Sequence, residues 1–218
     1  MPEQLEDASG YRGNADEVFR PATEQELIEI LNAAIQNRTP LTVSSARTGL
    51  TGGGIPQGGW ALSTEKLQRL EISPGSATAG AGVSLETLQS AASPTGQFYA
   101  PDPTERTASI GGTIATNASG SRSFRYGSTR KHILSLRVAL MDGSVRTFRR
   151  GDKVDFEVPR IPLPGTTKNT AGYALSPGMD WIDLFTGSEG TLGVVMEAEV
   201  QLLPKPQDVL AGVIFLSG

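Results

Sequence analysis

The chain of 218 residues carries a formal net charge of −4, and 38% of its residues are hydrophobic, as is typical of a soluble globular protein. It has no cysteine and one histidine, which excludes disulfides, thiol catalysis, iron–sulfur clusters and multi-histidine metal sites. Its acidic balance gives no electrostatic reason to bind nucleic acid, and no apolar run approaches the roughly 18 residues that cross a bilayer. The polar, acidic start lacks the regions of a signal peptide, so a cytoplasmic location is expected.

The first part of the chain is typical of a β–α–β unit, which normally joins parallel strands. Thr23 and Glu26 have the spacing of a capping box, in which each side chain satisfies the other residue's backbone N–H. The helix that they start should end before Pro40. The expected order is a strand at 17–21, the helix from Thr23, a strand at 41–44, a glycine-rich loop at 46–59 and a strand at 60–63.

From Leu70 the pattern changes to short strands and turns. A β-hairpin is predicted over 132–149, because apolar residues alternate from Leu136 and Asp142-Gly143 supplies a turn. The other expected elements are a strand at 77–81, a short helix capped by Ser84, an irregular proline-containing segment at 99–104, a small-residue segment at 110–120, a long loop at 153–177, a strand at 194–202 and an apolar strand at 209–216.

Glycine accounts for 26 residues, and much of it gathers in three segments. These are ARTGLTGGG at 46–54, PDPTERTASIGGTIATNASG at 101–120 and GSEGTLG at 187–193. Each segment can bring backbone N–H groups close to an anion such as phosphate, and each is also compatible with an ordinary tight turn. The first matches neither the G-x-G-x-x-G nor the Walker pattern, so alone it is a weak signal.

Taken in order, the segments resemble the FAD-binding domain shared by relatives of vanillyl-alcohol oxidase and para-cresol methylhydroxylase. The likeness runs from about Glu17 to Pro206 and is strongest to the branch of the glycolate oxidase FAD subunit, D-lactate dehydrogenase and D-2-hydroxyglutarate dehydrogenase. It implies an α+β, PCMH-type fold of two α+β subdomains with FAD between them. The matching stretches are TGLTGG at 48–53, PDP at 101–103, SIGGTIATNASG at 109–120, RYG at 125–127, AGY at 171–173 and GSEGTLGVV at 187–195.

The same resemblance implies a division of the chain. Residues 1–69 would form the first FAD-binding subdomain and 70–206 the second, while 207–218 would begin a C-terminal cap, or substrate, domain. In the family the cap supplies the acid–base residues and, in some members, metal ligands, so no catalytic residue and no metal site is assigned here. Lys168, Asn169 and Tyr173 are interpreted as structural loop residues.

A set of FAD-binding residues also follows from the resemblance. The first glycine segment would bind the pyrophosphate through its backbone, and 101–104 would border the ribityl chain and flavin ring. Segment 109–117 would hold the phosphates and ribose, and 190–195 the adenosine end. The full set is Ala46, Arg47, Thr48, Gly49, Leu50, Thr51, Gly52, Pro101, Asp102, Pro103, Thr104, Ser109, Gly111, Gly112, Ile114, Ala115, Asn117, Gly120, Gly190, Val194 and Val195.

Two departures from the family matter. Relatives usually carry glycine where this chain has Ser45 and Arg47. The Arg47 guanidinium can pair with the phosphates, or its side chain can crowd them. Crowding is preferred at this point, because backbone N–H groups already bind the phosphates in relatives. No histidine or cysteine lies where relatives attach FAD covalently, and His132 is assigned to a strand start, so the expected cofactor is non-covalent FAD.

The function implied is that of a FAD-dependent oxidoreductase acting on CH–OH donors. A 2-hydroxy acid of the glycolate or D-lactate type would pass a hydride to flavin N5 and become a 2-keto acid, with a base from the cap. An electron-accepting partner subunit is a further expectation, and the chain alone should be inactive. Two alternatives stay open: the FAD domain of an alkylglycerone-phosphate-synthase-like enzyme, and a non-catalytic FAD-binding or docking subunit.

Overall fold

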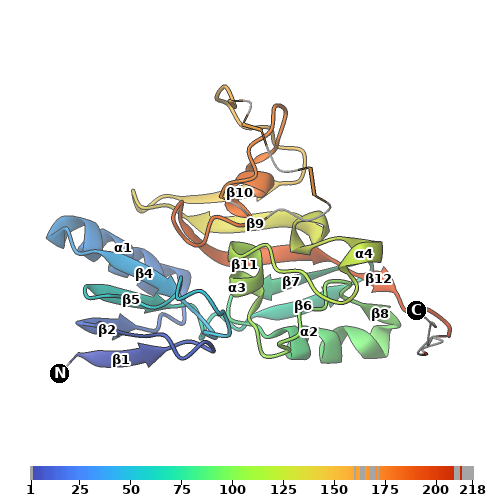
Figure 1. The fold of residues 1–218 in the computed structure, drawn as a ribbon, viewed down its shortest axis with the longest axis horizontal. Helices are drawn as coiled ribbons and strands as arrows, with labels where there is room; N and C mark the ends of the chain where they lie inside the picture. The colour runs from blue at the N-terminus through green and yellow to red at the C-terminus, as the bar shows by residue number, and fades with distance from the viewer. Residues whose placement is uncertain are drawn as a thin grey trace, which may run out of the picture.

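The computed structural model describes residues 2–159, 161–162, 165–166, 170, 172–208 and 212. Two α+β parts lie side by side, the N-terminal part in blue to cyan and the C-terminal part in green to red (Figure 1). The N-terminal part has a hairpin and a three-stranded parallel sheet, and the C-terminal part is built on a five-stranded antiparallel sheet. The α+β class expected from the sequence is confirmed.

The predicted β–α–β unit forms the N-terminal part. Its parallel sheet has the order β3-β5-β4, and helix α1 (Glu24–Asn37) connects β3 to β4. The hydroxyl of Thr23 accepts the N–H of Glu26 at 3.2 Å, as predicted. The Glu26 carboxylate instead accepts the N–H of Ala22 at 2.7 Å, so this half of the predicted capping box was wrong by one residue. The strands are β3 (Glu17–Phe19), β4 (Leu41–Ser44) and β5 (Trp60–Ser63).

A β-hairpin that the sequence did not predict precedes this unit. Strands β1 (Glu3–Glu6) and β2 (Arg12–Ala15) pair antiparallel, and only Leu5 and Ala15 within them are buried. These two side chains pack with Ile55 in a small core of their own. Because the strands are short and mostly polar, their alternation is too weak to be read from sequence.

The C-terminal sheet has the strand order β10-β9-β11-β7-β6. The hairpin β9–β10 is confirmed, although His132 ends the 3-10 helix before it rather than starting the strand. Every second residue of β11 is buried, as its alternating sequence predicted. The strands are β6 (Leu70–Ser73), β7 (Ser76–Gly80), β9 (Ile133–Ala139), β10 (Val145–Arg149) and β11 (Val194–Gln201).

Short helices and turns surround this sheet. Helix α2 (Leu85–Ala92) is capped by Ser84 as predicted, and α3 (Ile110–Ala115) forms within the small-residue segment. Segment 99–104 contains neither helix nor strand, as its prolines required. The other elements are η1 (Ser93–Thr95), η2 (Thr129–His132), α4 (Ser123–Tyr126), α5 (Trp181–Phe185), β8 (Gln97–Phe98) and β12 (Leu203–Pro204).

Two expectations concern residues that are only partly described. The described residues within 153–177 form no helix or strand, in line with the predicted loop, and Lys168 and Asn169 lie outside the described residues. The strand expected at 209–216 also lies outside them, apart from Gly212. Within the described part of the chain, no helix is long and apolar enough to cross a membrane.

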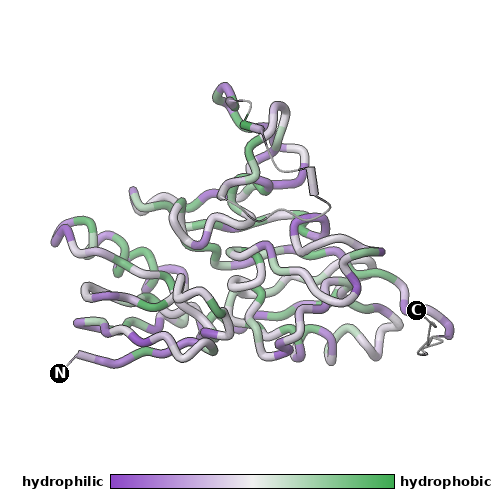
Figure 2. The backbone as a smooth tube through the Cα atoms, viewed as in Figure 1, coloured by the Kyte–Doolittle hydropathy of each residue, from purple (hydrophilic) through white to green (hydrophobic). Residues whose placement is uncertain are grey.

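The two parts share one core, which fixes their relative position. Hydrophobic and hydrophilic residues alternate along α1 (Figure 2), and its buried Leu27 and Leu31 form a cluster with Val194 and Met196 of β11. At the start of the same helix, Arg137 of β9 donates two hydrogen bonds to the Glu24 carboxylate, at 2.7 and 2.8 Å. Helix α1 therefore joins the two sheets through apolar contacts and an ion pair.

We expect Leu31→Ala to lower the free energy of unfolding by about 2–5 kcal/mol, because the fully buried side chain would leave a cavity where both parts meet. Urea unfolding followed by circular dichroism measures the loss. Ile35→Ala is the matched control, since Ile35 lies one turn further along α1 and is 42% exposed. Equal effects of the two substitutions would contradict the shared core.

Candidate cofactor-binding site

A cavity of about 260 Å³ lies between the two parts, where the three glycine segments meet. The loop after β4 forms one wall, the start of α3 another, and the turn before β11 the third. Segments far apart in sequence thus line one space. The predicted site residues that line it are Ala46, Arg47, Thr48, Gly49, Thr51, Pro103, Ser109, Gly111, Gly112, Ala115, Gly190 and Val195.

The other predicted site residues lie elsewhere. Leu50 and Asn117 line a neighbouring cavity of about 380 Å³, which shares Thr48, Gly49, Thr51, Thr116 and Glu189 with the first. Gly52 lies beside the first cavity without lining it. The residues that line neither cavity are Pro101, Asp102, Thr104, Ile114, Gly120 and Val194.

The loop after β4 is held from behind by the N-terminal hairpin. The Asp7 carboxylate accepts the N–H of Gly52 at 2.8 Å, and the carbonyl of Arg47 accepts the N–H of Ala8 at 3.1 Å. Hydrogen bonds from the Ser9 hydroxyl and the Gly52 N–H keep the pKa of Asp7 below its usual value. Asp7 is therefore ionised when it holds the loop in place.

The second wall depends on two close approaches that only glycine allows. A Cβ on Gly111 would lie 2.7 Å from the Cβ of Ala81, so glycine lets α3 pack directly against the end of β7. A Cβ on Gly120 would lie 1.7 Å from the carbonyl oxygen of Asp102. At the start of α3, the Ser109 hydroxyl accepts the N–H of Gly112 at 3.1 Å.

The turn before β11 is tied to the end of α3. The N–H of Gly187 donates to Ile114 O and the N–H of Glu189 to Ala115 O, both at 2.9 Å. Asn117 supports the turn indirectly. Its side-chain oxygen accepts the N–H of Arg130 at 3.1 Å, and Arg130 in turn binds the carbonyl of Thr186. Ile114 and Asn117 thus contribute by holding the turn in place.

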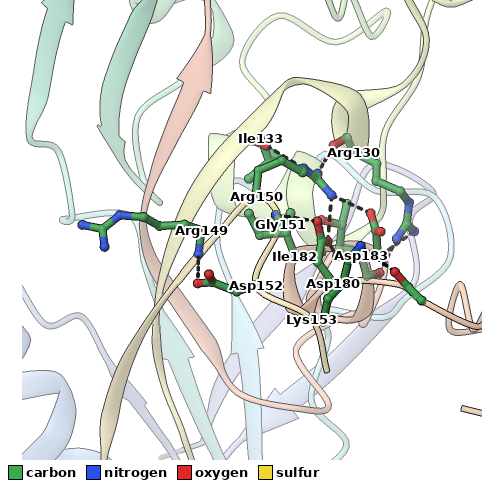
Figure 3. Close-up of polar contacts among 12 residues, drawn as sticks. Arg130, Ile133, Arg149, Arg150, Gly151, Asp152, Lys153, Asp180, Ile182 and Asp183 are labelled. Carbon is green, nitrogen blue, oxygen red and sulfur yellow. Dashed lines mark hydrogen bonds and ion pairs between the residues drawn. The ribbon is translucent and has the colours of Figure 1, made fainter. Parts of the chain in front are cut away.

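A network of ion pairs and hydrogen bonds around Arg130 and Arg150 (Figure 3) anchors the residues just before this turn. The Arg130 guanidinium donates to the carbonyl of Thr186, the C-cap of α5, at 2.6 Å, and to that of Asp183 within the helix. One nitrogen of Arg150 lies 2.8 Å from both the Asp180 and the Asp183 carboxylates, and another donates to Arg130 O at 2.6 Å. The two arginines link the hairpin β9–β10 to the turn.

Asp180 is the buried centre of this network, with a side chain only 5% exposed. Burial alone would raise its pKa, but N–H groups of Gly151 and Asp183 and the charge of Arg150 outweigh burial and lower the pKa below 3.8. Burial lowers the pKa of Arg130, which is half-buried. The sequence did not reveal this network, because its members lie far apart along the chain.

Sequence reasoning also missed several residues that line the cavity. Ser188 and Glu189 fall within a quoted motif and Ser44 lies two residues before another, so their position gave a usable signal. Asp7 belongs to the unpredicted hairpin and gave none. Other lining residues outside the predicted set include Val43, Ser45, Ile55, Thr64, Glu105, Ala108 and Thr113.

The chemistry of the cavity wall suits a phosphate-containing cofactor. Three residues that line it each carry a buried polar atom, Ser44 Oγ, Ser45 Oγ and Arg47 Nη1, that has no hydrogen-bond partner among the described residues. The space in front of Gly49 is open, since a Cβ there would meet nothing within 4 Å. The described residues contain no group of three or more side chains suited to a metal ion.

Comparison with known proteins identifies the family. Residues 15–149 match the family described as FAD binding domain, and the chain belongs to it. It is 38% identical over 195 residues to a D-lactate dehydrogenase of Archaeoglobus fulgidus, covering 88% of this chain and 40% of that protein. It is 36% identical over 202 residues to glycolate oxidase subunit GlcD of Bacillus subtilis, covering 90% of this chain and 39% of the subunit.

A solved structure has the same fold. A structure titled alkyldihydroxyacetonephosphate synthase in P1 superimposes with a TM-score of 0.67 at 19% identity, covering 88% of this chain and 34% of that one. The expected PCMH-type fold and FAD as the cofactor are confirmed. The chain spans about two fifths of the length of the curated relatives named above.

Asp180→Asn should lower the free energy of unfolding at pH 7 by about 1–3 kcal/mol, because it removes a hydrogen-bonded charge facing Arg150. The lowered pKa means that the carboxylate stabilises the fold above pH 3.8 and loses this effect as the pH falls further. The difference from wild type should therefore shrink in acid.

Urea unfolding between pH 7 and pH 3 measures this difference. Asp155→Asn is the control, since Asp155 is exposed on the loop after β10. This substitution should change stability little at any pH. A gap between wild type and Asp180→Asn that stays constant down to pH 3 would contradict the lowered pKa.

Proposed function

We propose that this chain is the FAD-binding part of an enzyme that oxidises a 2-hydroxy acid of the glycolate or D-lactate type to the 2-keto acid. The observation that carries the proposal is the meeting of the three glycine segments around one cavity, in a chain whose relatives are named D-lactate dehydrogenase and glycolate oxidase. When bound, FAD supplies the hydride acceptor. The protein's own residues bind and orient it.

The individual contacts follow from the walls of the cavity. The loop 46–52 would face the pyrophosphate, the residues at the start of α3 the phosphates and ribose, and Gly190 with Val195 the adenosine end. Pro103 would border the flavin side. Predicted site residues outside the cavity, such as Gly120 and Ile114, would act through the packing of its walls.

Catalysis would need residues outside these 218. We propose that the two parts divide near residue 70 and that 207–218 begins a cap domain, which would cover the flavin and supply the acid–base groups. A cytoplasmic location and an electron-accepting partner subunit also stay predictions. The likeness to the synthase is one of fold alone and gives no separate support for synthase chemistry.

The cofactor should be held without a covalent bond. His132, the one histidine of the chain, is buried away from the cavity lining, and its Nε2 lies 3.0 Å from the carbonyl oxygen of Tyr126. Acid precipitation of the flavin-loaded protein should therefore leave all flavin in the supernatant. Flavin in the washed pellet would contradict non-covalent binding.

Oxidation of a hydroxy acid should require more than this chain. In a dye-reduction assay with glycolate, D-lactate and D-2-hydroxyglutarate, the 218-residue chain loaded with FAD should match the blank, while a natural protein that continues into a cap domain should turn over at least one of them. Saturable activity of the short chain would mean that the active site is misplaced. An inactive long protein would count against the hydroxy-acid substrate.

A further inference from the structure

Three polar side-chain atoms without partners gather where β4 ends. Ser44 Oγ, Ser45 Oγ and Arg47 Nη1 are each buried, and none has a hydrogen-bond partner among the described residues. All three residues line the same cavity. Buried donors normally find a partner, because leaving one unpaired costs free energy. A ligand rich in acceptor oxygens, bound in this cavity, would supply the missing partners.

The cavity wall offers such a ligand a single positive charge. Among the described lining residues, Arg47 is the only cation, whereas Asp7, Glu105 and Glu189 are acidic. The Asp7 carboxylate is already held by Ser9 and Gly52, and no ion pair joins it to Arg47 within the described residues. The Arg47 guanidinium is therefore free to neutralise an anion.

The backbone of Arg47 gives an independent observation. Its φ is +53°, in the left-handed region that favours glycine, and its carbonyl is fixed by the N–H of Ala8. A residue with a side chain is strained there, whereas glycine is not. This strain explains why glycine suits the position. Arginine differs from glycine in bringing a guanidinium group, which has no protein partner here among the described residues and can bind a ligand.

We infer that Arg47, Ser44 and Ser45 form a side-chain anion site that binds the diphosphate of FAD, in addition to the backbone N–H groups of the loop. The inference rests on the proposed function, in which the cavity holds FAD. Guanidinium groups make strong, charge-assisted hydrogen bonds to phosphate oxygens. The preference for crowding that the sequence suggested is thereby replaced by pairing.

The test is FAD titration of flavin-free protein by flavin fluorescence at fixed salt. Arg47→Gln and Arg47→Gly should each weaken FAD binding, roughly 10- to 150-fold. Arg38 provides the matched control, because it is also an arginine at positive φ, 52°, but is exposed at the end of α1 and does not line the cavity. Arg38→Gln and Arg38→Gly should leave FAD affinity unchanged.

Competition separates a phosphate contact from a general loss of structure. The inhibition constant of ADP, corrected for the FAD affinity of each protein, should be much higher in Arg47→Gln than in wild type, whereas that of adenosine, which has no phosphate, should be the same in both. Ser45→Ala should weaken the binding of both FAD and ADP. This variant keeps the proposal testable if the Arg47 variants do not fold.

Three results would overturn the inference: tighter FAD binding by Arg47→Gly, equal losses for ADP and adenosine, or unchanged FAD affinity in both Arg47→Gln and Ser45→Ala. A wild-type protein that binds no FAD would instead refute the proposed function itself. Wild-type binding with unaffected variants leaves the proposed function intact and refutes only the side-chain anion site.

Discussion

The packing of α1 against both sheets is the constraint on which the cavity depends. The cavity walls come from two parts of the chain, so its shape is defined only while those parts keep their relative position. Leu31 and its neighbours bury apolar surface between β5 and β11, and the Glu24–Arg137 pair holds the start of the helix. Burial of apolar surface holds the two parts together, and the hydrogen-bonded ion pair fixes the orientation of α1 relative to β9. The ligand space is thus a consequence of how the two parts pack.

Binding and folding are coupled at this space. The apoprotein buries donors at Ser44, Ser45 and Arg47 without partners, which lowers its stability. A ligand that binds only the folded state adds stability in proportion to the logarithm of its concentration over its dissociation constant. The turn before β11, which forms another wall of the cavity, is held by Arg130 and Arg150. Arg130 binds the backbone carbonyl of Thr186, and Arg150 binds that of Arg130. The walls of the proposed anion site are therefore preorganised in the ligand-free protein.

Local patterns predicted much of the fold, and long-range contacts account for what was missed. The β–α–β unit, the Asp142-Gly143 hairpin and the alternation of β11 depend on neighbours in sequence and were found. The hairpin β1–β2 and the five-residue helix α5 have little periodicity, and tertiary packing stabilises them. The resemblance predicted the three segments that line the cavity. The contacts that hold them come from Asp7 and Arg130, and Arg150 in turn binds the carbonyl of Arg130; these residues lie tens of positions from their partners, which no local pattern records.

Residues assigned to a cofactor by family likeness divide into two physical roles. Gly111 and Gly120 are required for close approaches between protein segments, and Asn117 bonds the backbone of Arg130. Substituting Gly120 or Asn117 would change the shape of the wall through these protein contacts, since neither residue lines the main cavity. Arg47 is the reverse case, because it lies where relatives carry glycine and its guanidinium has no protein partner among the described residues. A motif thus records that a position matters to the site, and the surrounding contacts decide whether it touches the ligand.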